Sequence, residues 1–419
     1  MRHPHFLDAH WTFTLALLGA LALGCAQGAV DPAGGNPSGE GNPDEVPDGN
    51  GPVDNGSGGT AGNDTPGTND PGGNDPGNSG GNGGSPGNGG SPGNGGSPGN
   101  GGGGDPGGGG PAGDPGYGTG IFEAPNPWTK KIANLPPSGQ SAQIIAWLDQ
   151  AGGWGTGVMK IDFGMKILKA GNGAPKKQFF PTNEFYYPDC DEVPMPLPDN
   201  GSLESEAGYQ CAGDGDCHLI VVHEGEKKLY EMWRAHISAS NVFQGGCLAV
   251  WDLTKTYPEN LRGEGCTSAD AGGFPIAAMV FSPDEIATGV IDHAIRFILP
   301  NSRIRDNVYV HPGTHSTKAT SGGNNAPPYG VRLRLRADYP LQSLPSDGAR
   351  VIAKAMQEYG MFLVDGGNIA LSATSDQYTN AKWSQVGVNA QSMTSIKVTD
   401  MEVIDMGQPI NWSGDCIRS

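Results

Sequence analysis

The chain has 419 residues, a formal net charge of −19 at pH 7 and a mean hydropathy of −0.40. Such an acidic chain is repelled by nucleic-acid phosphates, so its charge argues against DNA or RNA as a partner. Many of the 71 glycines and 35 prolines lie in one stretch, which divides the chain into segments at 1–25, 26–118 and 119–419.

The first 25 residues are typical of an export signal. Arg2 precedes an apolar stretch over 13–23 that is too short for a permanent membrane helix. The sequence LALGC at 21–25 resembles the lipobox of bacterial lipoproteins, which implies that Cys25 carries lipid and anchors the protein at the outer membrane or cell surface. The alternative is a secreted protein whose ordinary signal peptide is cut after Ala26.

Residues 31–118 consist almost wholly of Gly, Asn, Pro, Asp and Ser, with the unit GGSPGN repeated around 83–100. The segment contains eleven acidic residues and no Lys or Arg. It cannot bury enough apolar surface to offset the entropy of ordering, so we expect 26–118 to be a disordered tether that reaches on the order of 50 Å. The folded part at 119–419 is then displayed outside the cytoplasm.

Six cysteines remain once Cys25 is lost to lipidation or cleavage. An even number in an exported chain predicts up to three disulfides, and the lack of a CxxC pair argues against a zinc–thiolate site. Cys211 and Cys217 are spaced to close a small loop, Cys190 is an equal partner for either, and Cys416 is expected to pin the tail. The six are Cys190, Cys211, Cys217, Cys247, Cys266 and Cys416.

The folded part begins with a helix and a strand. Apolar spacing over 138–151 predicts a short helix that Ser141 caps and that ends at a Gly-Gly pair. A strand is expected over 158–168, followed by an irregular passage rich in proline and aromatic residues at 179–198. Aromatic faces stack on sugar rings, so this passage is either a sugar-binding surface or a loop that covers the sheet.

Residues 217–236 have the pattern of a β-hairpin with a hydrophilic turn at 224–227. The first strand is apolar on both faces, so we expect it in the centre of a sheet. On the second strand, Leu229, Glu231 and Trp233 share one face. A carboxyl between Leu and Trp is desolvated, which raises its pKa and suits Glu231 to donate a proton near neutral pH. The alternative is a half-exposed Glu231 without a chemical role.

A further strand is expected over 247–253, and the loop after it contains CTSADAGGFP at 266–275. Asp270 in this loop is a candidate catalytic carboxylate, although an Asx turn is the commoner use of such a residue. The sequence SPDE at 282–285 forms a capping box with Pro at the first helical position, so a short helix is predicted from there to Gly289.

The densest set of polar residues among strand-like apolar ones lies at 291–336. In the strand that opens this segment, His293 shares one face with two isoleucines and Arg296 lies on the other face. His311 and His315 follow, next to a loop rich in Gly, Asn and Pro. If the protein has an active site, we expect it to use this segment.

The run at 331–336 alternates apolar residues with Arg332, Arg334 and Arg336. This alternation predicts a half-buried strand with a row of guanidinium groups on its open face. In an acidic protein such a row is a local exception, and it suits either an anionic ligand or pairing with acids on a solvated face.

The clearest helix is expected over 346–359, where Ser346 or Asp347 caps it and Gly360 ends it. A strand at 361–364 follows at once. Strands at irregular spacing with only three modest helices predict an all-β or β-dominated α+β domain, most simply a jelly-roll-like two-sheet sandwich. The lack of regular βαβ alternation argues against a doubly wound fold.

Three motifs, CTSADAGGFP, DHAIRF and YGMFLVDGG, resemble in this order a group of uncharacterised secreted bacterial proteins. The hairpin at 217–236 is similar to part of the same pattern, so the resemblance covers roughly 120–400. It implies secretion and no particular reaction.

The sequence contains no G-x-S-x-G elbow, HExxH motif, Walker loop or dinucleotide fingerprint. Serine hydrolysis, zinc proteolysis, nucleotide use and hydride transfer therefore have no positive support, and no cofactor is predicted. His311 and His315 have the spacing of metal ligands on a helix, but Pro312 and Gly313 prevent a regular helix, so no metal site is predicted.

The candidate residues suit a carbohydrate-active enzyme that acts on a polysaccharide or oligosaccharide. In a glycoside hydrolase, Glu231 is the acid with the raised pKa and Asp270 or Asp292 is the ionised carboxylate. The predicted catalytic residues are His293, Glu231, Asp270 and Arg332, and the predicted substrate-binding residues are Arg296, Arg334, His311, His315 and His218.

In a polysaccharide lyase, Arg332 or Arg334 neutralises a uronate carboxylate while His293 or His315 takes the proton. The arginines favour the lyase, and the acidic chain disfavours an anionic polymer, so both reactions stay open.

The competing class is a non-catalytic carbohydrate-binding or adhesion module held on the tether. Structural roles also compete: His293 as a core histidine, His218 beneath a disulfide, and the arginines as a solvated face.

Overall fold

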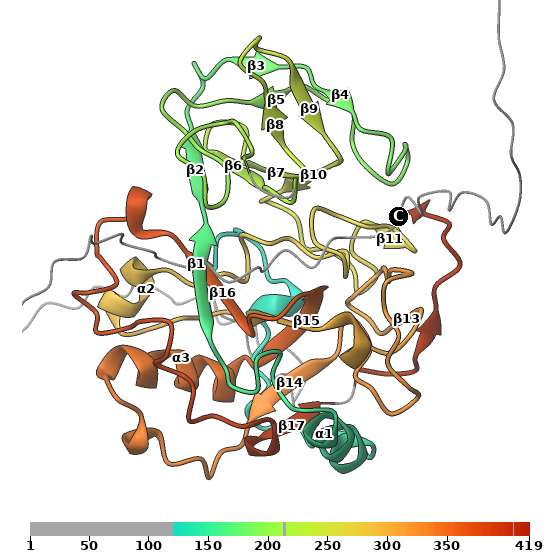
Figure 1. Ribbon diagram of the computed structural model, residues 1–419, viewed down its shortest axis with the longest axis vertical. Helices are drawn as coiled ribbons and strands as arrows, with labels where there is room; N and C mark the ends of the chain where they lie inside the picture. Colours follow the sequence, from blue (N-terminus) through green and yellow to red (C-terminus); the bar gives the residue numbers. More distant parts are fainter. Residues whose placement is uncertain (1–119, 213–214, 405) are drawn as a thin grey trace, which may run out of the picture. The chain divides into compact units, whose positions relative to one another are not determined.

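The structure is a computed structural model that describes residues 120–212, 215–404 and 406–419, all within one compact unit. The predicted signal segment with Cys25 and the predicted tether at 26–118 lie outside the described residues. The described part is dominated by β-strands and has three short α-helices, as the sequence predicts, and its strands form several mixed sheets (Figure 1).

The three helices form where the sequence predicts them: α1 (Ser141–Gln150), α2 (Pro283–Thr288) and α3 (Asp347–Glu358). The hydroxyls of Ser282 and Ser346 accept main-chain N–H groups and cap α2 and α3. Ser141 does not cap α1, because its hydroxyl accepts the N–H of Val403 at 2.8 Å instead. Five short 3-10 helices are Pro127–Thr129, Asn301–Arg303, Leu341–Ser343, Asp376–Tyr378 and Val398–Asp400.

The larger sheet has six strands in the order β1-β16-β12-β15-β14-β17. Their bounds are β1 (Ile161–Met165), β16 (Leu371–Thr374), β12 (Ile295–Leu299), β15 (Met361–Gly366), β14 (Arg332–Leu335) and β17 (Met401–Ile404). β1 with β16 and β12 with β15 are parallel pairs, and the other pairs are antiparallel.

The second sheet has four strands in the order β10-β7-β6-β2. Their bounds are β10 (Cys247–Asp252), β7 (Lys228–Trp233), β6 (Leu219–His223) and β2 (Ile167–Ala170). The predicted hairpin is β6 with β7, and β6 occupies the expected central position.

Short strands form four small sheets, pairing β11 with β19, β13 with β18 and β3 with β5, and β9 with both β4 and β8. Their bounds are β3 (Lys176–Lys177), β4 (Phe180–Pro181), β5 (Met195–Pro196), β8 (His236–Ile237), β9 (Phe243–Gly245), β11 (Gly263–Glu264), β13 (Val308–Tyr309), β18 (Ile410–Asn411) and β19 (Ile417–Arg418).

Two predicted strands have different bounds in the structure. The run expected at 158–168 is two strands, β1 and β2, which the single residue Lys166 separates and which join different sheets (Figure 1). The strand expected from Ile291 begins at Ile295 instead, so His293 precedes it.

Alternation along the strands distributes the apolar side chains among three clusters. On β15, Met361 and Leu363 join a cluster that also contains apolar residues of α1 and α3. Phe362 and Val364 join a second cluster, together with side chains of β7 and β10 such as Trp251. Because both faces of β15 are covered, this strand is apolar without interruption from 361 to 364.

The prediction of an open arginine face on β14 is wrong. Arg332 and Arg334 are only 3% and 7% exposed, and Arg336 alone is exposed. The strand lies between β15 and β17, and the segment at 127–135 covers its arginine side. Carbonyl oxygens of that segment accept hydrogen bonds from Arg332 and Arg334, which explains how the guanidinium groups are buried.

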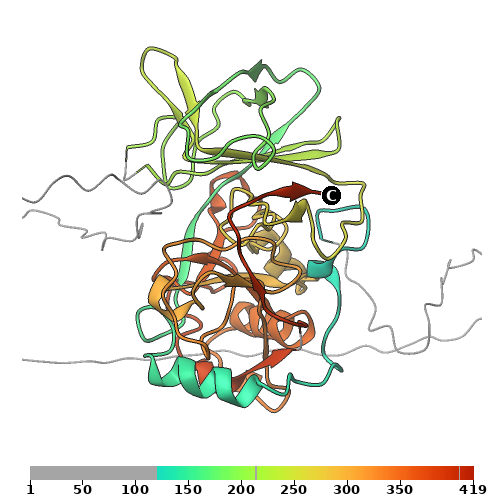
Figure 2. The same cartoon turned by 90° about the vertical axis from the view of Figure 1, so that its right-hand side faces the viewer.

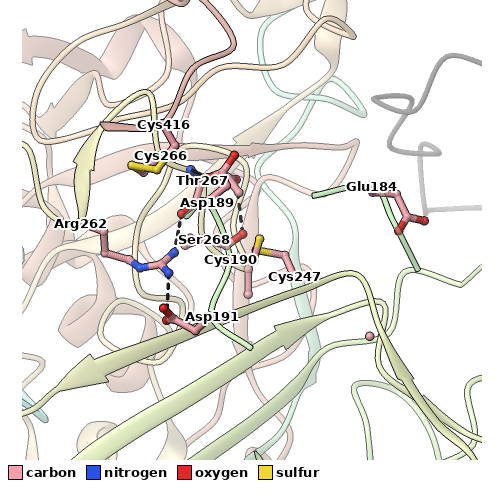
Figure 3. Close-up of a disulfide and its surroundings, with 12 residues drawn as sticks. Glu184, Asp189, Cys190, Asp191, Cys247, Arg262, Cys266, Thr267, Ser268 and Cys416 are labelled. Atoms are coloured by element: carbon pink, nitrogen blue, oxygen red, sulfur yellow. Dashed lines mark hydrogen bonds and ion pairs between the residues drawn. A yellow bond between two sulfur atoms is a disulfide. The ribbon is translucent and has the colours of Figure 1, made fainter. Parts of the chain in front are cut away.

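All six cysteines of the described chain form disulfides: Cys190–Cys247, Cys211–Cys217 and Cys266–Cys416. Figure 3 shows the first and third of these near Arg262, whose guanidinium contacts Asp191 at 2.9 Å and donates to the carbonyl of Thr267 at 2.6 Å. Disulfides persist in oxidising compartments, so these three support a location outside the cytoplasm.

The described helices include none that combines the length and the apolar character needed to cross a membrane.

Removing the Cys266–Cys416 disulfide by Cys→Ala substitution at both positions should destabilise the protein more than removing Cys211–Cys217. The two bonds span 150 and 6 residues of sequence, and a longer closed loop restricts the unfolded chain more. We expect losses of about 5 and about 2 kcal/mol in the free energy of unfolding, measured in urea. Equal losses, or the reverse order, would contradict this.

Candidate functional site

Two carboxyl groups from distant parts of the sequence lie around the buried guanidinium of Arg296. Arg296 on β12 is 2% exposed, and its Nη2 lies 2.7 Å from Oδ1 of Asp270 in the loop after β11. Its Nε donates to Oδ2 of Asp270 at 3.3 Å, and Nη1 donates to the hydroxyl of Ser372 on β16 at 2.6 Å. Asp365 on β15 places Oδ2 3.6 Å from Nη2. Each of the three resembling motifs therefore contributes one member of this group.

Strand alternation and one close backbone contact explain why these residues meet. On β12, Ile295 and Phe297 lie in the cluster beside α3, so Arg296 points to the opposite face. The loop that carries Asp270 is tied to β15 because the N–H of Gly272 donates to the carbonyl of Val364 at 2.6 Å. A Cβ at Gly272 would lie 3.0 Å from that oxygen, so only glycine permits this approach without a shift.

A second ion pair lies beside the first. Nδ1 of His218 is 2.7 Å from Oε2 of Glu204, and Nε2 is 3.0 Å from the carbonyl oxygen of Ala269, the neighbour of Asp270. Burial lowers the pKa of His218, but Glu204 raises it more, to about 10. Burial raises the pKa of Glu204, but His218 lowers it more, so its net shift is downward. The pair is therefore charged at neutral pH, with both ring nitrogens of His218 donating.

Arg296 and the Glu204–His218 pair line one polar cavity of about 60 Å³. A smaller cavity of about 30 Å³ adjoins Phe185, Trp233 and His315, and Asp365 lines both cavities. These volumes suit a few water molecules. The polar residues lining the larger of the two are Asp162, Glu204, Asp216, His218, Arg296, Asp365 and Ser372.

The carboxyl groups in this cavity have pKa values shifted in opposite directions. Burial and the carboxylate of Asp270 raise the pKa of Asp365 well above its ordinary value, against the opposing effect of Arg296. Burial and Glu204 also raise the pKa of Asp162. Glu204 has a lowered pKa, as described above. Perturbed carboxyl groups of this kind in a cavity are typical of functional sites, and we call this cluster the Arg296 cluster.

The structure brings three of the predicted site residues into this cluster: Asp270, Arg296 and His218. Glu231 lies outside its cavity and is fully buried, so the half-exposed alternative is wrong. Its carboxyl accepts N–H groups of Ile276 and Ala277 at 3.1 and 2.7 Å. Burial raises the pKa of Glu231 to about 7, and Asp270 adds to this, against those hydrogen bonds.

The predicted histidines are dispersed. His293 is buried, with Nε2 2.9 Å from Glu285 and Nδ1 2.8 Å from its neighbour's carbonyl oxygen, so it supports the capping box of α2. His315 contacts the carbonyl oxygen of Ala271 through Nδ1 at 2.7 Å. His311 pairs with Glu264 at 2.8 Å.

The predicted arginines of β14 are also separate from the cluster. Nη2 of Arg334 pairs with Glu402 at 2.7 Å. Arg332 lines a different, larger cavity together with His311. The predicted catalytic residues Arg332, His293 and Glu231 are thus hydrogen-bonded to other partners than Asp270 and Arg296.

Sequence reasoning missed four acidic residues of the cluster: Asp162, Glu204, Asp216 and Asp365. Asp365 carried a usable signal, because it ends a buried strand directly before Gly366 and Gly367. The other three carried none, since their positions depend on how the chain folds between the sheets.

One group of metal-type ligands occurs in the described part of the chain, formed by Glu206, Cys211 and Cys217. The two cysteines form a disulfide, so their sulfurs are not the thiolates that a metal binds.

Comparisons with known proteins give no relative: no family model, no curated protein and no solved structure matches this chain. The resemblance of the three motifs to secreted bacterial proteins stays a prediction.

Replacing Arg296 by Gln should lower the free energy of unfolding by about 3–5 kcal/mol, because Asp270 would remain buried without its charged partner. In the double variant with Asp270→Asn, the loss should be smaller than the sum of the two single losses. The control is Arg336→Gln, whose side chain is 49% exposed and whose loss should stay within about 0.5 kcal/mol. Additive losses in urea unfolding would argue against the pair.

Stability should fall with rising pH through the Glu204–His218 pair. The pKa of His218 is about 10 in the folded protein against 6.5 as reference, so its contribution is complete below pH 6.5 and is lost towards pH 10. The slope from this residue is at most about 1.4 kcal/mol per pH unit. His218→Gln and Glu204→Gln should both flatten the curve of unfolding free energy over this range, and curves parallel to the parent would refute the pair.

Proposed function

We propose that this chain is an extracytoplasmic carbohydrate-active enzyme that hydrolyses glycosidic bonds at the Arg296 cluster. One observation carries the proposal: Asp365 and Glu204 line the same cavity with pKa values shifted in opposite directions. Both side chains keep 18% of their surface exposed, whereas Asp270 and Arg296 are almost fully buried. Two carboxyl groups with opposed protonation are the usual requirement for glycoside hydrolysis.

In this proposal, Asp365 is the general acid. Its raised pKa keeps the proton that it donates to the glycosidic oxygen as the bond to the anomeric carbon breaks. Glu204 accepts a proton from the water whose oxygen forms the new bond to that carbon. Arg296 and Asp270 are positioning residues, because they fix the position of Asp365 and place one positive and one negative charge beside its carboxyl group.

Exposed aromatic rings support a sugar as the substrate. Tyr186 and Tyr187 are 65% and 73% exposed, and their neighbour Phe185 lines the small cavity that Asp365 also lines. Exposed apolar groups that lie next to one another form the kind of surface patch that marks a ligand-binding site. Since the two cavities are large enough only for a few water molecules, the sugar would lie at their mouth and stack on this loop.

The cluster supports hydrolysis better than a lyase reaction. The charge of Arg296 is already neutralised by Asp270, so Arg296 is not available to neutralise the carboxylate of a uronate. Both cations that line the cavity, Arg296 and His218, are already paired with carboxylates, so they offer little attraction to an acidic polymer. A neutral polysaccharide is therefore the proposed substrate.

A non-catalytic carbohydrate-binding module is the second candidate. The exposed rings of Phe180, Tyr186 and Tyr187 favour it, because stacking alone is enough to hold a sugar.

Two finer expectations belong to the same proposal. One is a jelly-roll-like sandwich arrangement of the two larger sheets. The other is the lipid anchor at Cys25 with the tether at 26–118, which would display the domain at the outer membrane or cell surface.

Asp365→Asn should lower the activity on a neutral polysaccharide by about 100-fold or more, because an amide cannot donate the required proton. The substitution is isosteric and replaces a group whose pKa is already raised, so we expect the fold to persist. The assay measures new reducing ends released from plant, algal and bacterial polysaccharides.

The matched control is Asp338→Asn, whose carboxyl is 73% exposed and which should keep full activity. Full activity of Asp365→Asn would reject the proposed acid. An unsaturated product absorbing in the ultraviolet would show a lyase instead. Binding without product, lost in Tyr186→Ala and Tyr187→Ala, would favour the binding module.

A further inference from the structure

A third cavity, of about 730 Å³, lies beside β14 and β15. Its lining comes from residues within 125–135, 256–259 and 311–312, from Ile404, Met406 and Gly407, and from Arg332 and Phe362. The volume is within the usual range for a site that binds a small organic molecule. It is also far larger than the water-sized cavities of the Arg296 cluster.

The buried guanidinium of Arg332 lines this cavity and is held by neutral groups. Its Nε donates to the carbonyl of Tyr359 at 2.8 Å, Nη1 to that of Pro127 at 3.1 Å and Nη2 to that of Lys130 at 2.7 Å. Nη2 also donates to Tyr359, and the guanidinium lies 4.6 Å from the centre of the Phe362 ring. These contacts fix its orientation and leave one N–H of Nη1 without a partner among the described residues.

Carbonyl groups do not neutralise a cation, and Arg332 differs in this respect from the other buried arginines of the described chain. The other three each contact a carboxylate: Arg262 with Asp191, Arg296 with Asp270 and Arg334 with Glu402. Burial lowers the pKa of Arg332 to about 9, and no charged group of the described part offsets this effect. A buried positive charge at the wall of a cavity, with no carboxylate partner among the described residues, attracts an anion.

The remaining lining indicates what kind of anion fits. Pro125, Ile132, Leu135 and Tyr257 present mostly apolar surface to the cavity. At its rim, Lys130 and Glu259 carry opposite charges, and His311 is already paired with Glu264. The ligand therefore needs one anionic group for Arg332 and an apolar or ring-shaped body.

We propose that this cavity binds an organic carboxylate whose charged group pairs with Arg332 and whose body lies against Tyr257 and Ile132. The ligand differs from the neutral polysaccharide proposed above, so this is a second site and does not depend on hydrolysis at the Arg296 cluster. Arg332 offers one positive charge and one N–H that has no partner among the described residues, which suits a singly charged carboxylate. A doubly charged phosphate would need a second cation to be stable beside the apolar lining.

Calorimetric titration of the full chain tests this with benzoate, D-glucuronate and a galacturonate dimer. The neutral counterparts are benzamide and D-glucose, and inorganic phosphate is the competing anion. At least one carboxylate should bind at least about tenfold more tightly than its neutral counterpart and than phosphate. Comparing the affinity for benzoate with the affinities for the two sugar acids shows whether the site prefers an aromatic or a carbohydrate carboxylate. Equal affinity for the neutral compound or for phosphate, or no binding at all, would overturn the proposal.

Three variants place the binding in this cavity. Arg332→Gln should remove the preference for carboxylates, and the exposed Arg336→Gln is its matched control. Because Arg332 is buried and its substitution risks the fold, Thr256→Trp provides a second test: Thr256 is exposed and lines the cavity, so an indole there should block entry. Unchanged carboxylate affinity in Thr256→Trp would overturn the assignment. Hydrolysis at the Arg296 cluster should be unaffected by it, which keeps the two proposals separable.

Discussion

The buried pair of Arg296 and Asp270 is the interaction on which the functional part of this fold depends. A guanidinium that is 2% exposed loses several kcal/mol of hydration, and only a fully formed set of partners compensates for that loss. Asp270 supplies the opposite charge and Ser372 a further acceptor, from a loop and from a neighbouring strand. The pair therefore requires β12, β16 and the loop after β11 to be in place together. The same requirement holds Asp365 at a fixed distance from the guanidinium.

One disulfide and one further ion pair support the loop that carries Asp270. Cys266, four residues earlier, is bonded to the C-terminal tail, and Arg262 holds both Thr267 and Asp191 (Figure 3). The strand pair of β11 with β19 places the tail alongside the start of this loop (Figure 2). Packing adds to these bonds, because Ala269, Phe274 and Ile276 of this loop belong to the second apolar cluster.

Two buried arginines on the strands that flank β15 illustrate how the partners of a charge decide its chemistry. Arg296 on β12 has a carboxylate partner, so its charge is used within the protein and shapes the pKa of Asp365. Arg332 on β14 has carbonyl partners, so its charge is oriented without being neutralised. The first arrangement is suited to positioning an acid, and the second is suited to receiving an anion.

The sequence by itself determined the local features, because they depend on neighbours in the chain. The caps at Ser282 and Ser346, the hairpin of β6 with β7 and the even number of cysteines could all be read from spacing and residue type. Only the tertiary structure decided which faces are covered. The alternation around Arg332 is the same whether or not a distant segment covers the arginine face, so the sequence could not show that the face is buried. The sequence of β1 and β2 likewise resembles one continuous strand, although the two strands belong to different sheets. The members of the site could not be predicted for the same reason. Glu204, Asp270 and Asp365 come together through packing between distant segments, and such packing leaves no periodic pattern in the sequence.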